Sequence, residues 1–540
     1  MGIALGLMLA AGLLTANAAA QGELRFCLRT DPKTFDPLLA AEEASETVRY
    51  LTGGVLIRFN RKTQGLEPEL ADSWKLQDGG RRIDFLLRSG IHFSDGTPFD
   101  AEDVLATFRR ISDPAFASAI ADEFRSAGEG IKFSSSGRYG VSITFPQPLA
   151  GVEFLFDRLS FSSSRSAQKE KAVLGPFYVT EYKAGQHVLL RRNTYYWKKD
   201  RQSARLPYLD SIRLEIQSNR ENELLRYRRG ELDFIDKLDP ELFERLRKDM
   251  PTSVVDAGPS LDSEFLWFNQ AASAPIEEYK RAWFQSQRFR RAISAAIQRS
   301  DMVRLVYRGY GRPAGGPVSP SNHVWANARV QPHGYDLQEA RRLLQQDGFR
   351  WEGETLRDKQ GNAVEFSLIT NAGSKTRSQL GALLQQDLKK LGIRVNFTPL
   401  EFQSLIERIT KSQKYEACLL GFTNMDLDPN GQMNVWMSSS THHAWNPGQN
   451  TPATAWEAEI DGLMKTQATA ANPRARKLAF DRVQAIVSEQ APILYLVHPN
   501  VLVAVSGSVR NAAPSALAPH LYWNIEHLRL TDDRRTGREH

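Results

Sequence analysis

The chain has 540 residues, of which 41% are hydrophobic and 24% are charged, as in ordinary soluble globular proteins. This length exceeds what a single hydrophobic core usually supports, so two or more lobes are expected. The 69 basic and 63 acidic residues leave a net charge of only +6 and form no long block of one sign, which argues against nucleic-acid binding despite an isoelectric point near 9.1.

Residues 1–20 are predicted to be a signal peptide. Residues 3–14 form a short apolar run, and the small residues 18–20 before Gln21 provide a cleavage site. The segment departs from the usual pattern because no lysine or arginine precedes the apolar run. No other stretch is long and apolar enough to cross a bilayer. We therefore expect an exported protein that is soluble in the periplasm after cleavage.

The stretch from residue 71 to residue 111 predicts a strand, a turn and a helix. Ile83, Phe85 and Leu87 alternate with other residues, as in a strand with one buried face. A Ser-Asp-Gly-Thr-Pro run then favours a turn, and Asp100 suits the N-cap of the helix that follows. Apolar residues recur along that helix at helical spacing, so one of its faces should be buried.

As a string, this stretch resembles the signature of the extracellular solute-binding proteins of family 5. These are the peptide-, nickel- and related ligand-binding subunits of bacterial ABC importers. The matching segments occur in order at residues 71–74, 85–88, 93–98 and 101–104. The resemblance implies a protein that binds a small solute, has a membrane-embedded ABC transporter permease as its partner and needs no cofactor. These residues identify the family and are not expected to form the ligand site.

The rest of the chain predicts an α/β architecture. A second block that matches the family spans residues 174–197, and strand, helix and strand patterns follow one another from residue 212 to residue 235. Residues 364–397 form another strand-helix-strand unit. Residues 265–269 and 491–496 are apolar and resemble the two strands by which family members cross between lobes.

We therefore predict a two-lobed periplasmic-binding-protein-like type II fold with a hinge between the lobes and an extra subdomain. After the signal peptide, residues 21–265 should form lobe I, with a subdomain inserted at about residues 45–170. Residues 266–489 should form lobe II, residues 490–530 should return to lobe I, and residues 531–540 should be a polar tail.

The segment from residue 421 to residue 429 is the most informative for ligand binding. Peptide-binding members of the family carry a glycine-aromatic pair here and, three residues after the aromatic, an aspartate that pairs with the peptide's α-ammonium group. Counting from Phe422, the matching position is Met425, and Asp426 lies one residue later. Ligand contact and a plain turn are equally consistent with Asp426, whereas the pattern favours a turn for Asp428 before Pro429.

Two tryptophans in the loop that follows are further candidates, because functional loops of this kind line sites and indole rings stack on ligands. The predicted ligand-binding residues are Phe422, Asn424, Met425, Asp426, Trp436 and Trp445. His442 and His443 are adjacent, so their side chains diverge, and no cysteine or acid completes a set at ligand spacing; no metal site is predicted. The two cysteines, Cys27 and Cys418, are expected to be unpaired.

An enzyme is the competing class. The chain has no nucleophile elbow, no phosphate-binding loop, no zinc-protease motif and no Cys-x-x-Cys pair. Because carboxylates are plentiful, a secreted hydrolase that acts on peptides or glycosides with a paired-carboxylate site remains the alternative. The prediction is a monomeric binding protein without enzymatic activity, metal or nucleic-acid partner.

Overall fold

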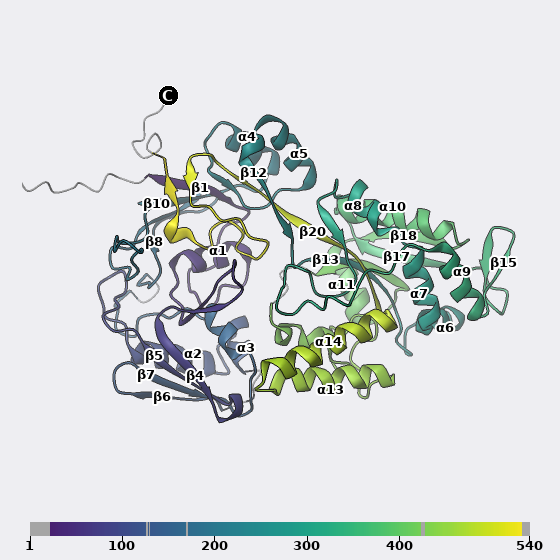
Figure 1. Ribbon diagram of the computed structural model, residues 1–540, viewed down its shortest axis with the longest axis horizontal. Helices are drawn as coiled ribbons and strands as arrows, with labels where there is room; N and C mark the ends of the chain where they lie inside the picture. Colours follow the sequence, from purple (N-terminus) through teal and green to yellow (C-terminus); the bar gives the residue numbers. More distant parts are fainter. Residues whose placement is uncertain (1–21, 126–127, 129, 169–170, 423–426, 532–540) are drawn as a thin grey trace, which may run out of the picture.

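The computed structural model describes residues 22–125, 128, 130–168, 171–422 and 427–531. Two lobes lie side by side and are joined by the long strand β20 (Ile493–Val505), which runs from one lobe into the other (Figure 1). The predicted α/β fold with two lobes is thus confirmed. Where the sequence divides into lobes, subdomain and tail stays a prediction, and the predicted signal peptide lies outside the described residues.

Lobe I contains a four-stranded sheet in the order β1-β10-β9-β8, in which β1 and β10 are parallel and the other neighbours antiparallel. Alternation along β1 buries Leu24, Phe26 and Leu28 against a core that includes residues of helix α1 (Glu43–Thr52). The strands of the sheet are β1 (Glu23–Leu28), β8 (Phe177–Lys183), β9 (His187–Arg192) and β10 (Ser211–Ile216).

The signature stretch folds into a separate layer below this sheet in Figure 1. It supplies two strands of a four-stranded antiparallel sheet in the order β4-β5-β7-β6, formed by β4 (Ala71–Gln77), β5 (Arg82–Leu87), β6 (Lys132–Ser136) and β7 (Gly140–Thr144). Ile83, Phe85 and Leu87 are buried with residues of α2 (Ala101–Ser112) and α3 (Ala119–Arg125). Asp100 caps α2 and forms a capping box with Asp103, so the predicted strand, turn and helix are confirmed.

The larger sheet has eight strands along the path β11-β20-β13-β19-β17-β18, with β12 and β14 also paired to β20, and lobe II is built on the part of it that contains β13, β19, β17 and β18. The predicted strand-helix-strand unit is present, because β17 and β18 are parallel neighbours connected by α10 (Lys375–Lys389). The strands are β11 (Phe234–Ile235), β12 (Val254–Pro259), β13 (Ser263–Phe268), β14 (Gly311–Pro313), β17 (Glu365–Asn371), β18 (Arg394–Leu400) and β19 (Ala417–Phe422).

The lobes are connected by two neighbouring strands. β20 pairs with β13 through its first half and with β12 and β11 through its second half, so its partners change around residues 498–500. The chain makes the same crossing between β12 and β13, where Ser260 N donates to Pro499 O over 2.8 Å. A small change of backbone angles in these two short segments is enough to rotate one lobe against the other. They form the hinge.

The remaining elements cover the sheets or form small hairpins. The other helices are α4 (Arg220–Arg228), α5 (Pro240–Asp249), α6 (Glu278–Gln285), α7 (Gln287–Ala296), α8 (Arg299–Leu305), α9 (Leu337–Gln346), α11 (Phe402–Glu407), α12 (Met433–Trp436), α13 (Ala455–Thr469) and α14 (Pro473–Gln490). The hairpin strands are β2 (Ile57–Phe59), β3 (Leu66–Pro68), β15 (Arg350–Glu352), β16 (Thr355–Arg357), β21 (Val509–Arg510) and β22 (Arg529–Leu530).

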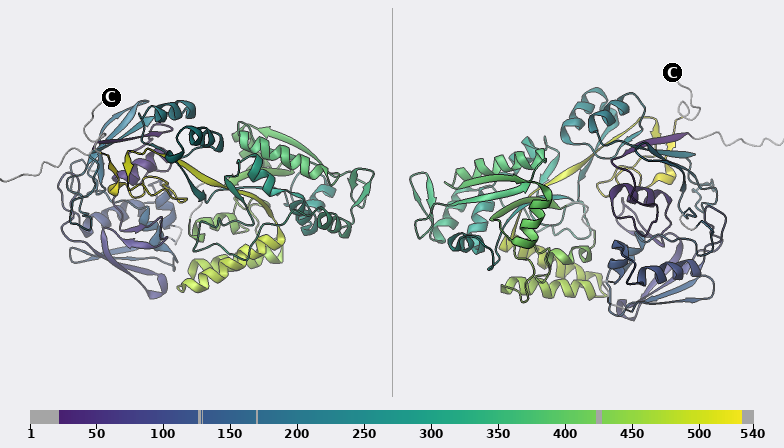
Figure 2. Two further views of the ribbon diagram at one scale, coloured as in Figure 1. Left: turned by 45° about the horizontal axis from the view of Figure 1, so that its top comes forward. Right: turned by 180° about the vertical axis from the view of Figure 1, so that it is seen from behind.

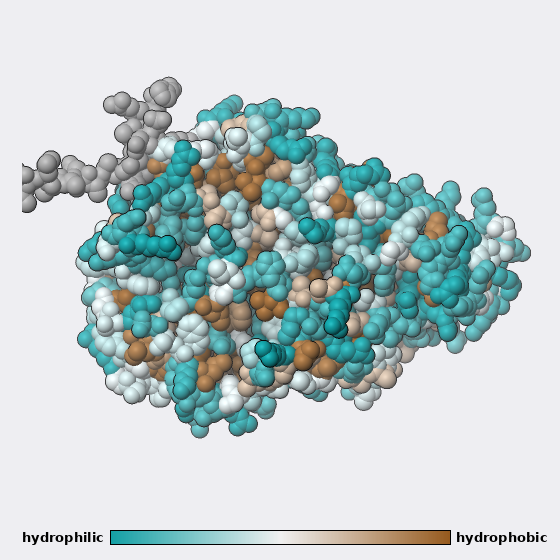
Figure 3. Space-filling model, in the orientation of Figure 1, coloured by the Kyte–Doolittle hydropathy of each residue, from teal (hydrophilic) through white to brown (hydrophobic). Residues whose placement is uncertain are grey.

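Within the described ranges, no helix has both the length and the apolar character that a membrane span needs. Cys27 and Cys418 are both free thiols, as predicted. The surface is mostly hydrophilic at the outer end of lobe II, whereas hydrophobic residues are exposed nearer the middle of the molecule (Figure 3).

Candidate functional site

The strand β19 ends at Gly421 and Phe422, where the ligand segment was predicted. Phe422 pairs with Ser263 of β13, and its half-buried ring lies 4.6 Å from the ring of Phe265. At Gly421, a Cβ atom would lie only 2.7 Å from Ser263 O and 2.9 Å from Arg377 Nη2. A larger residue would therefore push against both the neighbouring strand and an arginine.

That arginine belongs to an ion pair which the sequence did not reveal. Arg377 Nε lies 2.9 Å from Glu264 Oε2, and Arg377 Nη1 donates to Asn371 Oδ1 over 2.7 Å. The Arg377 and Glu264 side chains are largely buried, and burial raises the pKa of Glu264 although Arg377 opposes the shift. A matched pair of charges thus stands beside the end of β19, contributed by α10 and β13.

Three predicted ligand residues, Asn424, Met425 and Asp426, lie outside the described residues, so their roles stay predictions. The residues that follow them, Leu427 and Asp428, are held by hydrogen bonds. Leu427 O accepts a 2.9 Å hydrogen bond from Asn322 Nδ2, and Asp428 Oδ1 accepts a 3.0 Å hydrogen bond from the backbone N–H of Asn430. The predicted turn at Asp428 is confirmed, since this bond caps a 3₁₀ turn that begins at Pro429.

Asp428 has a second partner that lies 48 residues further along the chain. Arg476 of α14 approaches it with Nη2 2.6 Å from Asp428 Oδ1, and both side chains are only 8% exposed. Arg476 Nε also donates to Gln467 O over 2.8 Å, and the guanidinium lies 5.0 Å from the centre of the Trp325 ring. Such a buried pair is held in one geometry, because either charge alone would be costly to bury.

Lobe I touches lobe II at this pair. Ala150 N donates to Ala468 O over 3.0 Å, and Asn430 Nδ2 donates to Ala150 O. Gly151 has a left-handed φ of 72°, and a Cβ on it would lie 2.6 Å from Asp428 Oδ2. Figures 1 and 2 show the ends of α13 and α14 against the subdomain from several sides. We call this group, Ala150 and Gly151 with Asp428, Asn430, Ala468 and Arg476, the lobe contact.

Glu153 adds a carboxyl group to the lobe contact from the side of lobe I. Burial raises the pKa of Glu153, whose carboxyl interacts with both Arg476 and Asp428. A second connection between the lobes runs through Gln64, which donates to Ser321 O and accepts from the backbone N–H of His323. The lobes therefore meet both at the hinge and at points remote from it along the chain.

The two candidate tryptophans are placed in the core of lobe II. Trp436 is 1% exposed and Trp445 0%, and both belong to the apolar cluster that also contains Phe265 and borders Phe422. In this conformation neither ring offers surface to a ligand, so stacking on a ligand would require their exposure. Their role in binding stays a prediction.

A buried carboxylate explains where Trp445 and His443 point. Glu457 Oε1 accepts from Trp445 Nε1 at 2.9 Å and Gln449 Nε2 at 3.0 Å and lies 3.2 Å from His443 Nε2, while Thr454 Oγ1 donates to Glu457 Oε2 at 2.8 Å. Although burial opposes the shift, these hydrogen bonds lower the pKa of Glu457 to about 2. Hydrogen bonds to the buried carboxylate of Glu457 thus hold the loop that contains His443, Trp445 and Gln449 in place.

Phe422 and the lobe contact occupy the two ends of one short segment, whereas Trp436 and Trp445 lie behind it in the core. Within the described part of the chain, no group of three or more histidine, cysteine or acidic side chains is arranged to hold a metal ion. Chemically, the described residues around this segment offer a half-buried aromatic ring at a strand end and two largely buried charge pairs. Such an arrangement suits non-covalent binding.

Comparison with known proteins identifies relatives that match most of the chain. The family model for bacterial extracellular solute-binding proteins, family 5 Middle, matches residues 65–443, which is more than half of the sequence. A probable ABC transporter-binding protein of Deinococcus radiodurans is 25% identical over 439 residues, which cover 74% of this chain and 73% of that protein. Oligopeptide-binding protein AppA of Bacillus subtilis is 23% identical over 495 residues, covering 87% and 85%.

A solved structure gives the same result for the fold. The crystal structure of NikA from Brucella suis in complex with Fe(III)-EDTA superposes with a TM-score of 0.79 at 20% sequence identity, covering 94% of this chain and 100% of NikA. At this identity the likeness concerns the fold alone.

Proposed function

Because the chain belongs to the bacterial extracellular solute-binding proteins of family 5, we propose that it captures a small solute between its two lobes and delivers it to a membrane-embedded ABC transporter permease. The family match carries this proposal. It favours solute binding over the alternative of a secreted hydrolase with paired carboxylates, and on this proposal the protein has no enzymatic activity.

The hinge and the lobe contact support a closing movement. The two crossing segments are short and adjacent, so the lobes rotate about one line. The lobe contact joins the lobes through Ala150 and Ala468, and it places Gly151 directly against Asp428. Because Asp428 lies in the predicted ligand segment, two residues after Asp426, closure and ligand contact are coupled through this residue.

The proposed ligand is a peptide or a peptide-like molecule. The name of the relative from Bacillus subtilis supports this class. Met425 replaces the acid that the family resemblance places opposite a peptide's ammonium group, and a methionine is a flexible apolar filler. We therefore propose that the ligand is uncharged or apolar at that point and that ordinary free dipeptides are not the natural solute.

The proposal includes an exported, periplasmic protein whose residues 1–20 are removed, and which acts as a monomer without metal, cofactor or nucleic acid. A thermal-shift screen against peptides, amino-acid conjugates, sugars and metal chelates tests the function, because a tight ligand stabilises the folded state by mass action. We expect at least one of these classes to raise the melting temperature without being consumed. Turnover of the stabilising compound would instead support the hydrolase.

A further inference from the structure

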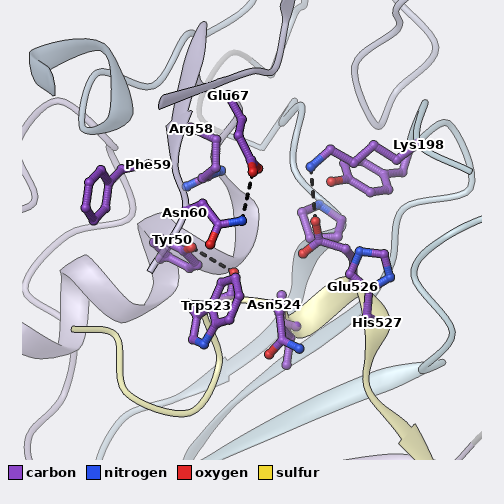
Figure 4. Close-up of a pocket in the computed structure, with 13 residues that line it drawn as sticks. Tyr50, Arg58, Phe59, Asn60, Glu67, Lys198, Trp523, Asn524, Glu526 and His527 are labelled. Carbon is purple, nitrogen blue, oxygen red and sulfur yellow. Dashed lines mark hydrogen bonds and ion pairs between the residues drawn. The ribbon is translucent and has the colours of Figure 1, made fainter. Parts of the chain in front are cut away.

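A cavity of about 280 Å³ in lobe I is lined by none of the residues of the lobe contact. Figure 4 shows its walls. Its walls come from three separate segments, residues 50–67, 176–198 and 523–527, whereas the lobe contact uses residues 150–151, 428–430, 468 and 476. Nothing in the proposed capture of a solute between the lobes uses this space. It contains charged side chains that a simple packing void would not have.

Charges of opposite sign are balanced in and directly beside the cavity. Arg61 lies 3.0 Å and Arg58 3.4 Å from the carboxylate of Asp157, and Lys198 lies 2.8 Å from Glu69 and 3.1 Å from Glu526. Among the lining residues themselves, the two cations Arg58 and Lys198 face two carboxylates, Glu67 and Glu526. An occupant with a single net charge would leave one buried charge without a counterpart, which is costly.

The hydrogen-bonding capacity of the walls is only partly used. A guanidinium has five N–H donors, yet among the described residues the acceptor contact of Arg58 is the single 3.4 Å approach to Asp157, with the Tyr50 ring 4.8 Å away. The side-chain oxygen of Asn524 is buried without a partner. Glu526 contacts Lys198, and figure 4 shows the Arg58 and Lys198 side chains on opposite sides of the cavity.

Glu526 and Lys198, on the side of the cavity opposite Arg58, both stay charged near neutral pH. Although burial opposes it, the Lys198 ammonium holds the pKa of Glu526 below its usual range. Burial also opposes ionisation of Lys198, but the neighbouring carboxylate of Glu69 and the further one of Glu526 keep its pKa well above the ordinary value. The cavity thus presents free donors at Arg58 and free acceptor capacity at Glu526 and Asn524.

We propose that this cavity binds a small zwitterion of the amino-acid class. Its carboxylate accepts hydrogen bonds from Arg58, and its ammonium group donates to Glu526 and to the side-chain oxygen of Asn524. The ligand is neutral overall and so preserves the balance of charges. The volume of about 280 Å³ is sufficient for one free amino acid.

Titration calorimetry with three matched probes tests the chemistry: a free amino acid, its amide, which lacks the carboxylate, and the corresponding α-hydroxy acid, which lacks the ammonium. Thermal-shift measurements across the free amino acids select the side chain. We expect the amino acid to bind, and each of the two analogues to bind at least about tenfold more weakly, because each loses a charged hydrogen-bonding group. Absence of binding by any free amino acid at millimolar concentration would overturn the proposal.

Variants locate the site. Tyr196 is buried and lines the cavity, and Tyr196→Phe removes only its hydroxyl, so this variant should fold normally and weaken binding several-fold. Arg58→Lys keeps the charge, loses the planar fork and should weaken binding further. Tyr195→Phe changes a neighbouring exposed ring outside the cavity and is the matched control.

The variant Gly151→Ala, which alters the lobe contact, shows whether the amino acid binds in this cavity or between the lobes. The proposal expects amino-acid binding to be unchanged in Gly151→Ala and Tyr195→Phe and weakened in Tyr196→Phe and Arg58→Lys. Binding that responds to Gly151→Ala and ignores both cavity variants would place the amino acid between the lobes and overturn the proposal. A crystal structure grown with the bound amino acid should show it between Arg58 and Glu526.

Discussion

Replacing Gly151 by alanine tests whether the lobe contact contributes to ligand affinity. Gly151 has a φ of 72°, and the new Cβ would lie 2.6 Å from Asp428 Oδ2 and 2.9 Å from Arg476 Nη1. The left-handed backbone costs a non-glycine residue about 1–2 kcal/mol whether or not the lobes touch. The steric conflict is different, because it exists only while lobe I lies against Asp428 and Arg476.

Overpacking of a tight contact costs about 1–3 kcal/mol, and here that cost falls on the form in which the lobes touch. If the solute binds to this form, its dissociation constant should rise by about 5- to 150-fold in Gly151→Ala. Titration calorimetry with a solute that stabilises the wild type measures the change.

Gly185→Ala is the matched control, since Gly185 has a φ of 70° and nothing within 4 Å of the position of a Cβ. This variant should show a comparable loss of thermal stability from backbone strain but bind the solute with unchanged affinity. Equal affinities for Gly151→Ala and the wild type, or an equal loss of affinity in Gly185→Ala, would refute the role of the lobe contact.

Two further predictions concern lobe II. The pKa of Glu457 is lowered from 4.5 to about 2, so the stabilisation it provides, about 3 kcal/mol, is fully present above pH 4.5 and is lost as the pH falls toward 2. Urea unfolding should therefore show Glu457→Gln to be about 3 kcal/mol less stable than the wild type at neutral pH, with a smaller difference in acid; a pH-independent difference would contradict this. For Met425, loss of one partner of a buried charge pair costs about 3–5 kcal/mol, so calorimetry should find weak binding of free dipeptides and tighter binding by Met425→Asp. Micromolar binding of several free peptides by the wild type would show that another acid has taken over this role.

Local features of the fold were predictable from the sequence because they depend on neighbouring residues. The alternation of Ile83, Phe85 and Leu87 requires one buried face of a strand, and Asp100 followed by Asp103 supplies both halves of a capping box. The parallel pair β17 and β18 likewise follows from a helix placed between two apolar strands.

Features that depend on distant partners were not predictable. A polar loop with two tryptophans suggests a ligand surface, but Glu457 draws Trp445 inward through a hydrogen bond and leaves it fully buried. Asp428 was expected to form a turn, which it does, yet its ion pair with Arg476 requires α14 to pack against the segment that follows β19. No local sequence pattern predicts a contact between residues that are 48 positions apart.

The cavity in lobe I is hidden from the sequence for the same reason. Arg58, Lys198 and Glu526 are separated by well over a hundred residues from one another, and each alone looks like an ordinary charged surface residue. Only the folding of the C-terminal segment back onto lobe I brings them to one space.

Small-angle X-ray scattering with and without a stabilising solute tests the proposed capture between two closing lobes most directly. Saturation with the solute should reduce the radius of gyration, and the scattering curve of the bound protein should agree with the present structure, in which Ala150 N lies 3.0 Å from Ala468 O. A saturating solute that raises the melting temperature and leaves the radius of gyration unchanged would contradict closure about the hinge.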